Sequence, residues 1–168
     1  LLIIQKEYSK FDGTNERLDL LALNEEGNLV VIENKLDDSG RDVVGQALKY
    51  AAFCSVNTPE KIIKIYQEYL DSNNSGEDAR KSIQKFLQIE DEDALILGKN
   101  EESIILVANK YRDEVISTVL WLLRHGHNIK CFKATPIEFE EHAFLNIEQI
   151  IPQPDTQKDM ISIYEKDK

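Results

Sequence analysis

Two short apolar runs, within 17–23 and 29–35, are separated by a polar turn. Short apolar runs bounded by turn residues are typical of buried β-strands, whose side chains point to opposite faces in turn. Residues 24–28 read Asn-Glu-Glu-Gly-Asn, which suits a three-residue hairpin loop with Gly27 at the position of positive φ. The pattern therefore predicts an antiparallel hairpin with Leu23 opposite Leu29 and Leu21 opposite Val31.

Charged residues interrupt both apolar runs of this hairpin. Asp19 lies within the first run, and Glu33 and Lys35 end the second. The register set by the turn places Asp19 opposite Glu33, with about 5 Å between their Cβ atoms. Arg17 and Lys35 share the face of the two acids, because side chains alternate along a strand. Burying such charges costs several kcal/mol unless they are paired or bound to a metal, so this cluster needs a reason.

The rest of the pattern predicts an α/β fold in which a mixed sheet is flanked by helices, in the order βββα(αα)βαβ. Further strands are expected at 1–8, 103–109 and 128–135, with a short one at 143–151; helices are expected at 41–54, about 59–70, about 78–89 and 112–125. The strand–helix–strand unit at 103–135 suits a right-handed parallel crossover. We expect one domain over 1–152 and a polar tail over 153–168.

Capping and breaking residues refine the helices. Residues 37–40 (Asp-Asp-Ser-Gly) suit a loop that caps the first helix, in which Gly45 suggests a close approach of another backbone segment. Thr58 and Pro59 suit the cap and first position of the second helix. Gly126 is expected to end the last helix.

Composition limits the classes of function. The 168 residues carry a formal net charge of −11, which argues against broad non-specific binding to DNA or to an anionic membrane but leaves room for a local basic patch. No apolar run is long enough to span a membrane, and no signal peptide is apparent. Cys54 and Cys131 lie far apart in apolar stretches, which favours two reduced core thiols and a cytoplasmic location.

The paired carboxylates suggest metal chemistry. Two carboxylates about 5 Å apart repel unless a cation lies between them, and Mg²⁺ prefers oxygen ligands. A bound ion of this kind activates water and neutralises phosphate charge. Lys35 can position or deprotonate the water, and Arg17 can reach a phosphate oxygen. On the helix that follows, Gln46 and Tyr50 are four residues apart and Lys49 is their neighbour, so this face can complete a phosphate-binding wall.

These residues carry a resemblance to a known family. The sequence resembles the PD-(D/E)XK nuclease superfamily, whose restriction endonuclease-like core has an acid on a hairpin, then (D/E)-x-K, then a helix. Asp19 matches the first acid, Glu33-Asn34-Lys35 matches E-x-K, and Gln46 with Tyr50 resembles the Gln-x-x-x-Tyr motif of the RecB-like branch. The wider strings 17–22, 27–33 and 45–51 are similar to bacterial NucS-like domains. The resemblance covers about residues 1–54, and Leu18 stands where the motif has Pro.

The resemblance implies an Mg²⁺- or Mn²⁺-dependent endonuclease or exonuclease that acts on DNA, with a homodimer as a possible assembly. It implies that Asp19, Glu33 and the Asn34 backbone carbonyl bind the metal, while Lys35 and Gln46 complete the catalytic group. Arg17, Arg41, Lys49 and Tyr50 would bind substrate. The family's first helix is not in this chain, which opens abruptly inside a strand-like pattern, so we expect an upstream segment to be missing.

Several residues also have plain structural interpretations. Asp19, Glu33 and Lys35 can form a structural ion triad, or the fold can be an inactive module that binds nucleic acid or protein. Arg17 can pair with either acid, Gln46 and Tyr50 can form an ordinary polar helix face, and Arg41 can be a solvated surface residue. Surface or structural roles are favoured for the remaining features: His125, His127, the acidic run 90–93, and Trp121 as a residue of core or interface packing.

Overall fold

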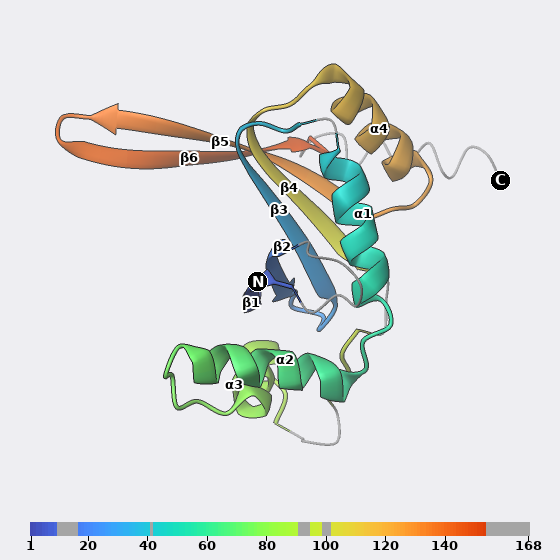
Figure 1. The fold of residues 1–168 in the computed structure, drawn as a ribbon, viewed down its shortest axis with the longest axis vertical. Coiled ribbons are helices and arrows are strands. Elements are labelled where there is room, and N and C mark those ends of the chain that lie inside the picture. The colour runs from blue at the N-terminus through green and yellow to red at the C-terminus, as the bar shows by residue number, and fades with distance from the viewer. Residues whose placement is uncertain (10–16, 41, 91–94, 99–101, 154–168) are drawn as a thin grey trace. The chain divides into compact units, whose positions relative to one another are not determined.

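The structure, a computed structural model, describes residues 1–9, 17–40, 42–90, 95–98 and 102–153. Within these ranges the order of elements is βββαααβαββ (Figure 1). The strands are β1 Leu2–Tyr8, β2 Leu18–Leu23, β3 Leu29–Asp38, β4 Ser103–Lys110, β5 Ile129–Phe139 and β6 His142–Ile151. The helices are α1 Val43–Cys54, α2 Pro59–Ser72, α3 Ala79–Leu87 and α4 Asp113–Arg124. The predicted α/β class with a mixed sheet and flanking helices is confirmed.

The strands form one sheet in the order β1-β2-β3-β4-β5-β6. The pairs β1–β2, β2–β3 and β5–β6 are antiparallel, and α4 connects the neighbours β4 and β5. No helix in the described part of the chain is long and apolar enough to cross a membrane.

The predicted strand order is wrong at its end, because the chain closes on a long β5–β6 hairpin rather than on one strand and a short addition. Strand β5 continues past Pro136 to Phe139, and the turn is Glu140-Glu141, with Glu140 at φ 52°. The predicted strand ended at Thr135; the proline that follows usually interrupts a strand, and the turn lacks the Gly or Asn that marks a hairpin. Tertiary pairing overrides both local signals here.

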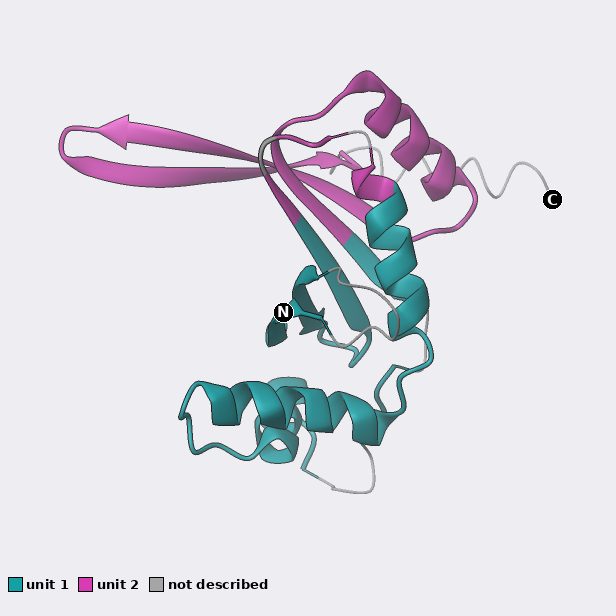
Figure 2. Cartoon of the chain, in the orientation of Figure 1, with its two compact units in different colours: residues 1–33, 45–104 teal, residues 34–44, 105–168 magenta. Residues whose placement is uncertain are grey.

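The chain divides into two compact units (Figure 2). Unit 1 contains residues 1–33 and 45–104, and unit 2 contains residues 34–44 and 105–168. The division falls inside β3, between Glu33 and Asn34. The predicted domain limits, 1–152 and 153–168, stay predictions, and residues 154–168 lie outside the described part of the chain.

The β2–β3 hairpin of unit 1 has the predicted register. Leu21 pairs with Val31 and Leu23 pairs with Leu29, and all four side chains are buried. The turn is closed by Asn24, whose side-chain oxygen accepts hydrogen bonds from the backbone N–H groups of residues 26 and 28, at 3.0 and 2.9 Å. The predicted positive φ at Gly27 is confirmed at 78°. The hairpin turn therefore fixes which side chains share a face.

Gly27 has a second constraint that alternation alone does not reveal. Its carbonyl oxygen accepts a hydrogen bond from the N–H of Gly98 at 3.0 Å, and a Cβ added to it would lie 2.7 Å from the Ile96 carbonyl oxygen. Gly45 has no such constraint, since a Cβ added to it meets no described atom within 4 Å. The prediction that another backbone segment lies close to Gly45 is wrong.

We expect Gly27→Ala to lower the free energy of unfolding by about 2 kcal/mol or more, because left-handed backbone costs an L-residue about 1–2 kcal/mol and the Ile96 carbonyl must also move. Gly45→Ala is the matched control. It should raise the free energy of unfolding by about 0.5–1 kcal/mol, since alanine favours a helix interior. Urea unfolding followed by circular dichroism measures both changes; equal effects would contradict the assignment of the turn.

Capping residues act largely as predicted. In unit 1, the Thr58 side chain accepts a hydrogen bond from the N–H of Lys61 at 3.3 Å, and Pro59 opens α2. Asp78, which was not predicted as a cap, caps α3 in the same way. In unit 2, Gly126 follows α4 with φ 87°, as expected for a helix stop. The segment 37–40 departs from prediction, because β3 runs through Asp38 and this part is not a capping loop.

Two side chains near the end of α4 lie at the surface. Trp121 is 56% exposed and its ring stacks on His125 with 3.9 Å between ring centroids, so it is not a core residue. A packing role for Trp121 in the core is therefore wrong, and a role at an interface stays a prediction. His125 and His127 are both exposed, consistent with a surface or structural role.

Candidate functional site

The two candidate acids follow directly from the β2–β3 register. The ladder ends at the pair of Leu20 with Ile32, and the next residues outward along the two strands are Asp19 and Glu33. Both remain within their strands, β2 and β3. Directly opposed residues of an antiparallel pair have Cβ atoms about 4.5–5.5 Å apart. The predicted opposition of the two carboxylates therefore agrees with the observed register.

The two acids differ in burial. Glu33 is 2% exposed, whereas Asp19 is half-buried. A carboxylate as buried as Glu33 is costly in its charged form unless a cation, a proton or hydrogen-bond donors offset the loss of water. Such a pair, one acid inside and one at the edge, is suited to holding a hard cation that still reaches solvent.

The helix α1 contributes Gln46, Lys49 and Tyr50 from unit 1. Gln46 and Lys49 are half-buried, and the Lys49 ammonium nitrogen lies 5.8 Å from the centre of the Tyr50 ring. Tyr50 is 2% exposed, and its hydroxyl donates a hydrogen bond to the Arg17 carbonyl oxygen at 3.1 Å. This contact ties α1 to the start of β2, one residue away from Leu18 and two from Asp19.

The structure gives Tyr50 a contact that the sequence did not suggest. Spacing placed Tyr50 on one face with Gln46, where it could equally meet substrate or solvent. Its burial beside Val43, Ala47 and Cys54, which are buried on the same helix, shows that the apolar stripe of α1 includes it. A tether between α1 and β2 is its observed role, and its binding of substrate stays a prediction.

Of the predicted basic residues Arg17, Lys35 and Arg41, the structure describes the first two. The Arg17 guanidinium lies 3.3 Å from a carboxylate oxygen of Glu7, and both side chains are exposed. Glu7 was not considered as its partner. Asn34 is exposed and Lys35 is half-buried on β3, beyond the division between the units. Arg41 lies outside the described residues.

The described residues contain no group of three or more His, Cys, Asp or Glu side chains that could hold a metal ion. The predicted site uses two carboxylate side chains and one backbone carbonyl, so it has fewer side-chain ligands than such a group. Asp19 and Glu33 supply oxygen donors from adjacent strands, as Mg²⁺ and Mn²⁺ require, and Mg²⁺ commonly keeps several waters beside one or two carboxylates. The chemistry of this donor pair fits the ion.

A polar cluster in unit 2 was missed by sequence analysis. The Arg112 Nε lies 2.7 and 2.9 Å from the two carboxylate oxygens of Asp38, and the N–H of Gly40 donates to Asp38 at 2.7 Å. The N–H of Ser39 donates to the Lys110 carbonyl at 2.9 Å. The hydrogen bond from Arg112 is the main reason that the pKa of Asp38 is lowered. These contacts fix the end of β3 against the start of α4.

The two cysteines are buried, as predicted, and carry no disulfide. Burial is the main cause that raises the pKa of both thiols to about 12. Near Cys131, the Tyr111 hydroxyl lies 2.7 and 2.9 Å from the carbonyl oxygens of Leu106 and Phe132, and burial raises its pKa. These groups are structural, because a thiol that holds its proton is a poor nucleophile.

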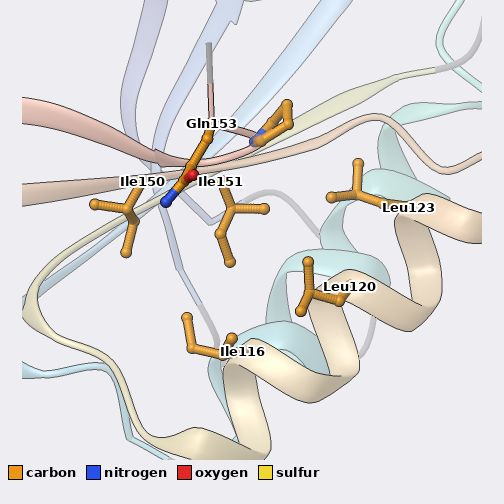
Figure 3. A pocket seen from close by; sticks show the side chains of 7 residues that line it. Ile116, Leu120, Leu123, Ile150, Ile151 and Gln153 are labelled. Atoms are coloured by element: carbon orange, nitrogen blue, oxygen red, sulfur yellow. The ribbon is translucent and has the colours of Figure 1, made fainter. Parts of the chain in front are cut away.

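A pocket of about 300 Å³ lies between α4 and the end of β6 in unit 2 (Figure 3). Its lining is apolar apart from the backbone and Gln153, and comprises Ile116, Leu120, Leu123, Ile150, Ile151, Pro152 and Gln153. No acid, lysine or histidine is among these described residues, so the pocket offers no acid–base chemistry. The pair of Asp19 and Glu33 remains the stronger candidate site.

Comparisons with models of protein families, with curated proteins and with solved structures gave no match.

Proposed function

We propose that this protein is a metal-dependent nuclease that hydrolyses phosphodiester bonds in DNA on a restriction endonuclease-like core. The observation that supports this most is the β2–β3 register, which pairs Leu20 with Ile32 and, continued by one residue along each strand, would set Asp19 opposite Glu33. Burial of Glu33 to 2% exposure adds to it, because a buried acid next to a second acid is costly without a cation.

Each residue has a defined role in this proposal. Bound Mg²⁺ or Mn²⁺ supplies an activated water and neutralises phosphate charge. Asp19 and Glu33 hold the ion through carboxylate oxygens, assisted by the Asn34 carbonyl. Lys35 lies two residues beyond Glu33 on β3 and orients the attacking water or takes its proton.

The α1 residues of the proposal bind and orient the substrate. Gln46 carries both a donor and an acceptor, so its amide can align the water or a phosphate oxygen without adding charge. Lys49, with Arg17 and Arg41, supplies local positive charge on a chain whose net charge is −11. The proposed location is cytoplasmic, where reduced thiols such as Cys54 persist.

Metal binding tests this proposal without a substrate. We expect titration calorimetry of the wild-type protein with Mn²⁺ to show one ion bound at millimolar concentration or below, and Glu33→Gln to weaken it about tenfold or more, because an amide lacks the negative charge of a ligand carboxylate. Glu25→Gln, an exposed acid in the hairpin turn, is the matched control and should bind as the wild type does.

The same titration separates the second candidate function. A protein on this fold that has lost catalysis and serves as a module for binding nucleic acid or protein would bind no metal at millimolar concentration. Binding that is equal in Glu33→Gln and the wild type would place the ion elsewhere and contradict the site.

A further inference from the structure

The β5–β6 hairpin carries exposed apolar surface that the proposed nuclease site does not use. The two strands pair from Cys131 opposite Ile151 to Phe139 opposite His142. Residues 133–148 form what we call the arm, in which no side chain is buried. Figure 2 shows the arm running out beyond the other elements of unit 2. An isolated two-stranded hairpin is marginally stable in water, so an exposed arm of this length needs an explanation.

Both faces of the arm are apolar. Ile137 pairs with Phe144 on one face, and Pro136 pairs with Leu145 on the other. Five large apolar side chains of the arm are 47–65% exposed: Ile137, Phe139, Phe144, Leu145 and Ile147. Ile137, Phe139 and Phe144 lie on one face of the arm, and Leu145 and Ile147 lie on the other. Exposed large apolar side chains gathered in this way on both faces of one hairpin mark an interaction site.

We propose that the arm binds the arm of a second copy of this chain. Strand β6 is the last strand of the sheet, so among the described residues its outer edge has no neighbouring strand to pair with its N–H and C=O groups. A second β6 presents the same edge, and two identical edges pair antiparallel about a two-fold axis. Such pairing extends the sheet from one copy into the other.

The apolar residues of β6 support a second copy as the occupant. When two β6 edges pair, Phe144, Leu145 and Ile147 of one copy lie beside apolar residues of the other copy, in addition to the backbone hydrogen bonds between the edges. The charge of the arm disfavours other partners. Glu138, Glu140 and Glu141 surround the tip, where they would repel DNA and anionic lipid.

The pairing has a preferred register. Opposed residues must share a face, so the two-fold axis passes through a residue of β6. An axis at Leu145 sets this residue against its own copy, Ala143 against Ile147, and His142 against Glu148. An axis one residue later sets Phe144 against Glu148. An axis one residue earlier shortens the ladder to five pairs, because β6 begins at His142.

Sedimentation equilibrium of the whole 168-residue protein tests this proposal. We expect a dimer that Leu145→Glu weakens by roughly 100-fold, because the substitution faces two carboxylates against each other at the centre of the interface. The thermal unfolding temperature of the monomer should not fall, since Leu145 is exposed. Val56→Glu is the matched control, because Val56 is also exposed but lies in unit 1, and it should leave the dimer intact.

A cross-link tests the register independently. Leu145→Cys should form a disulfide-linked dimer under mild oxidation, whereas Val56→Cys should not, and the buried Cys54 and Cys131 do not compete. A wild-type protein that stays monomeric at all concentrations would overturn the proposal, as would a dimer indifferent to Leu145→Glu. Equal cross-linking of both cysteine variants would also count against it. None of these readouts depends on metal binding or DNA cleavage.

Discussion

Asp19→Asn is expected to lower metal-dependent DNA cleavage by about 100-fold or more while leaving the free energy of unfolding in metal-free buffer unchanged or higher. Removing a ligand carboxylate loses several kcal/mol of transition-state stabilisation, and each 1.36 kcal/mol is about a tenfold change in rate. Without metal, the same substitution removes the negative charge that, in the proposed site, stands opposite the buried Glu33 and opposes its ionisation. A fall in cleavage rate together with an unchanged or higher free energy of unfolding is what removal of a metal ligand should produce.

Chemical unfolding in the presence of EDTA measures the stability change, and Asp19→Ala checks that it does not depend on the new amide. A loss of about 3–5 kcal/mol on either substitution is what breaking a buried ion pair costs, and would identify Asp19, Glu33 and Lys35 as a structural triad. The control Glu25→Gln should change neither activity nor stability, since Glu25 is exposed in the turn.

Tyr50→Ala is expected to destabilise the protein by about 3–5 kcal/mol, the usual cost of truncating a buried aromatic side chain. Tyr50→Phe keeps the ring and removes only the hydroxyl that donates to the Arg17 carbonyl, so it should cost about 0.5–1.5 kcal/mol. Urea unfolding of the two variants beside the wild type measures both values.

The cleavage rate of Tyr50→Phe separates the two roles of this residue. If the hydroxyl only ties α1 to the start of β2, cleavage by Tyr50→Phe under stable conditions should stay within a few-fold of the wild type. A loss of 100-fold or more with intact folding would instead show that the hydroxyl meets substrate, as the resemblance implied. Lys49→Ala is a second variant for the same cleavage assay. It removes the positive charge next to Tyr50 and leaves the buried Tyr50 ring in place.

The local signals in the sequence are strongest where one face of an element is buried and its turn is chemically specific. The register at 20–32 could be predicted because Gly27 must adopt positive φ and the apolar residues on both sides then fall on common faces. The cap at Thr58 could be predicted for the same kind of reason. The opposition of Asp19 and Glu33 depends only on these local rules.

The features that were missed depend on contacts between distant segments. Tyr50 bonds to a backbone carbonyl 33 residues earlier, and Arg112 bonds to a carboxylate 74 residues earlier. Hydrogen bonds between residues so far apart in the sequence cannot be predicted from the spacing of residue types. The long arm was missed because its strands are exposed, so neither alternation of burial nor a Gly-containing turn marks it. The exposure of Trp121 was missed because its neighbours along α4 are apolar.

DNA cleavage in the presence of Mn²⁺ tests the central claim most directly. Single-stranded, duplex and branched DNA are incubated with the wild-type protein and with Lys35→Ala, each with Mn²⁺ and with EDTA. We expect the wild type to cut at least one substrate only when Mn²⁺ is present, and Lys35→Ala to cut it about 100-fold or more slowly. Absence of cleavage of every substrate by the wild type, or equal cleavage by Lys35→Ala, would contradict the proposed nuclease.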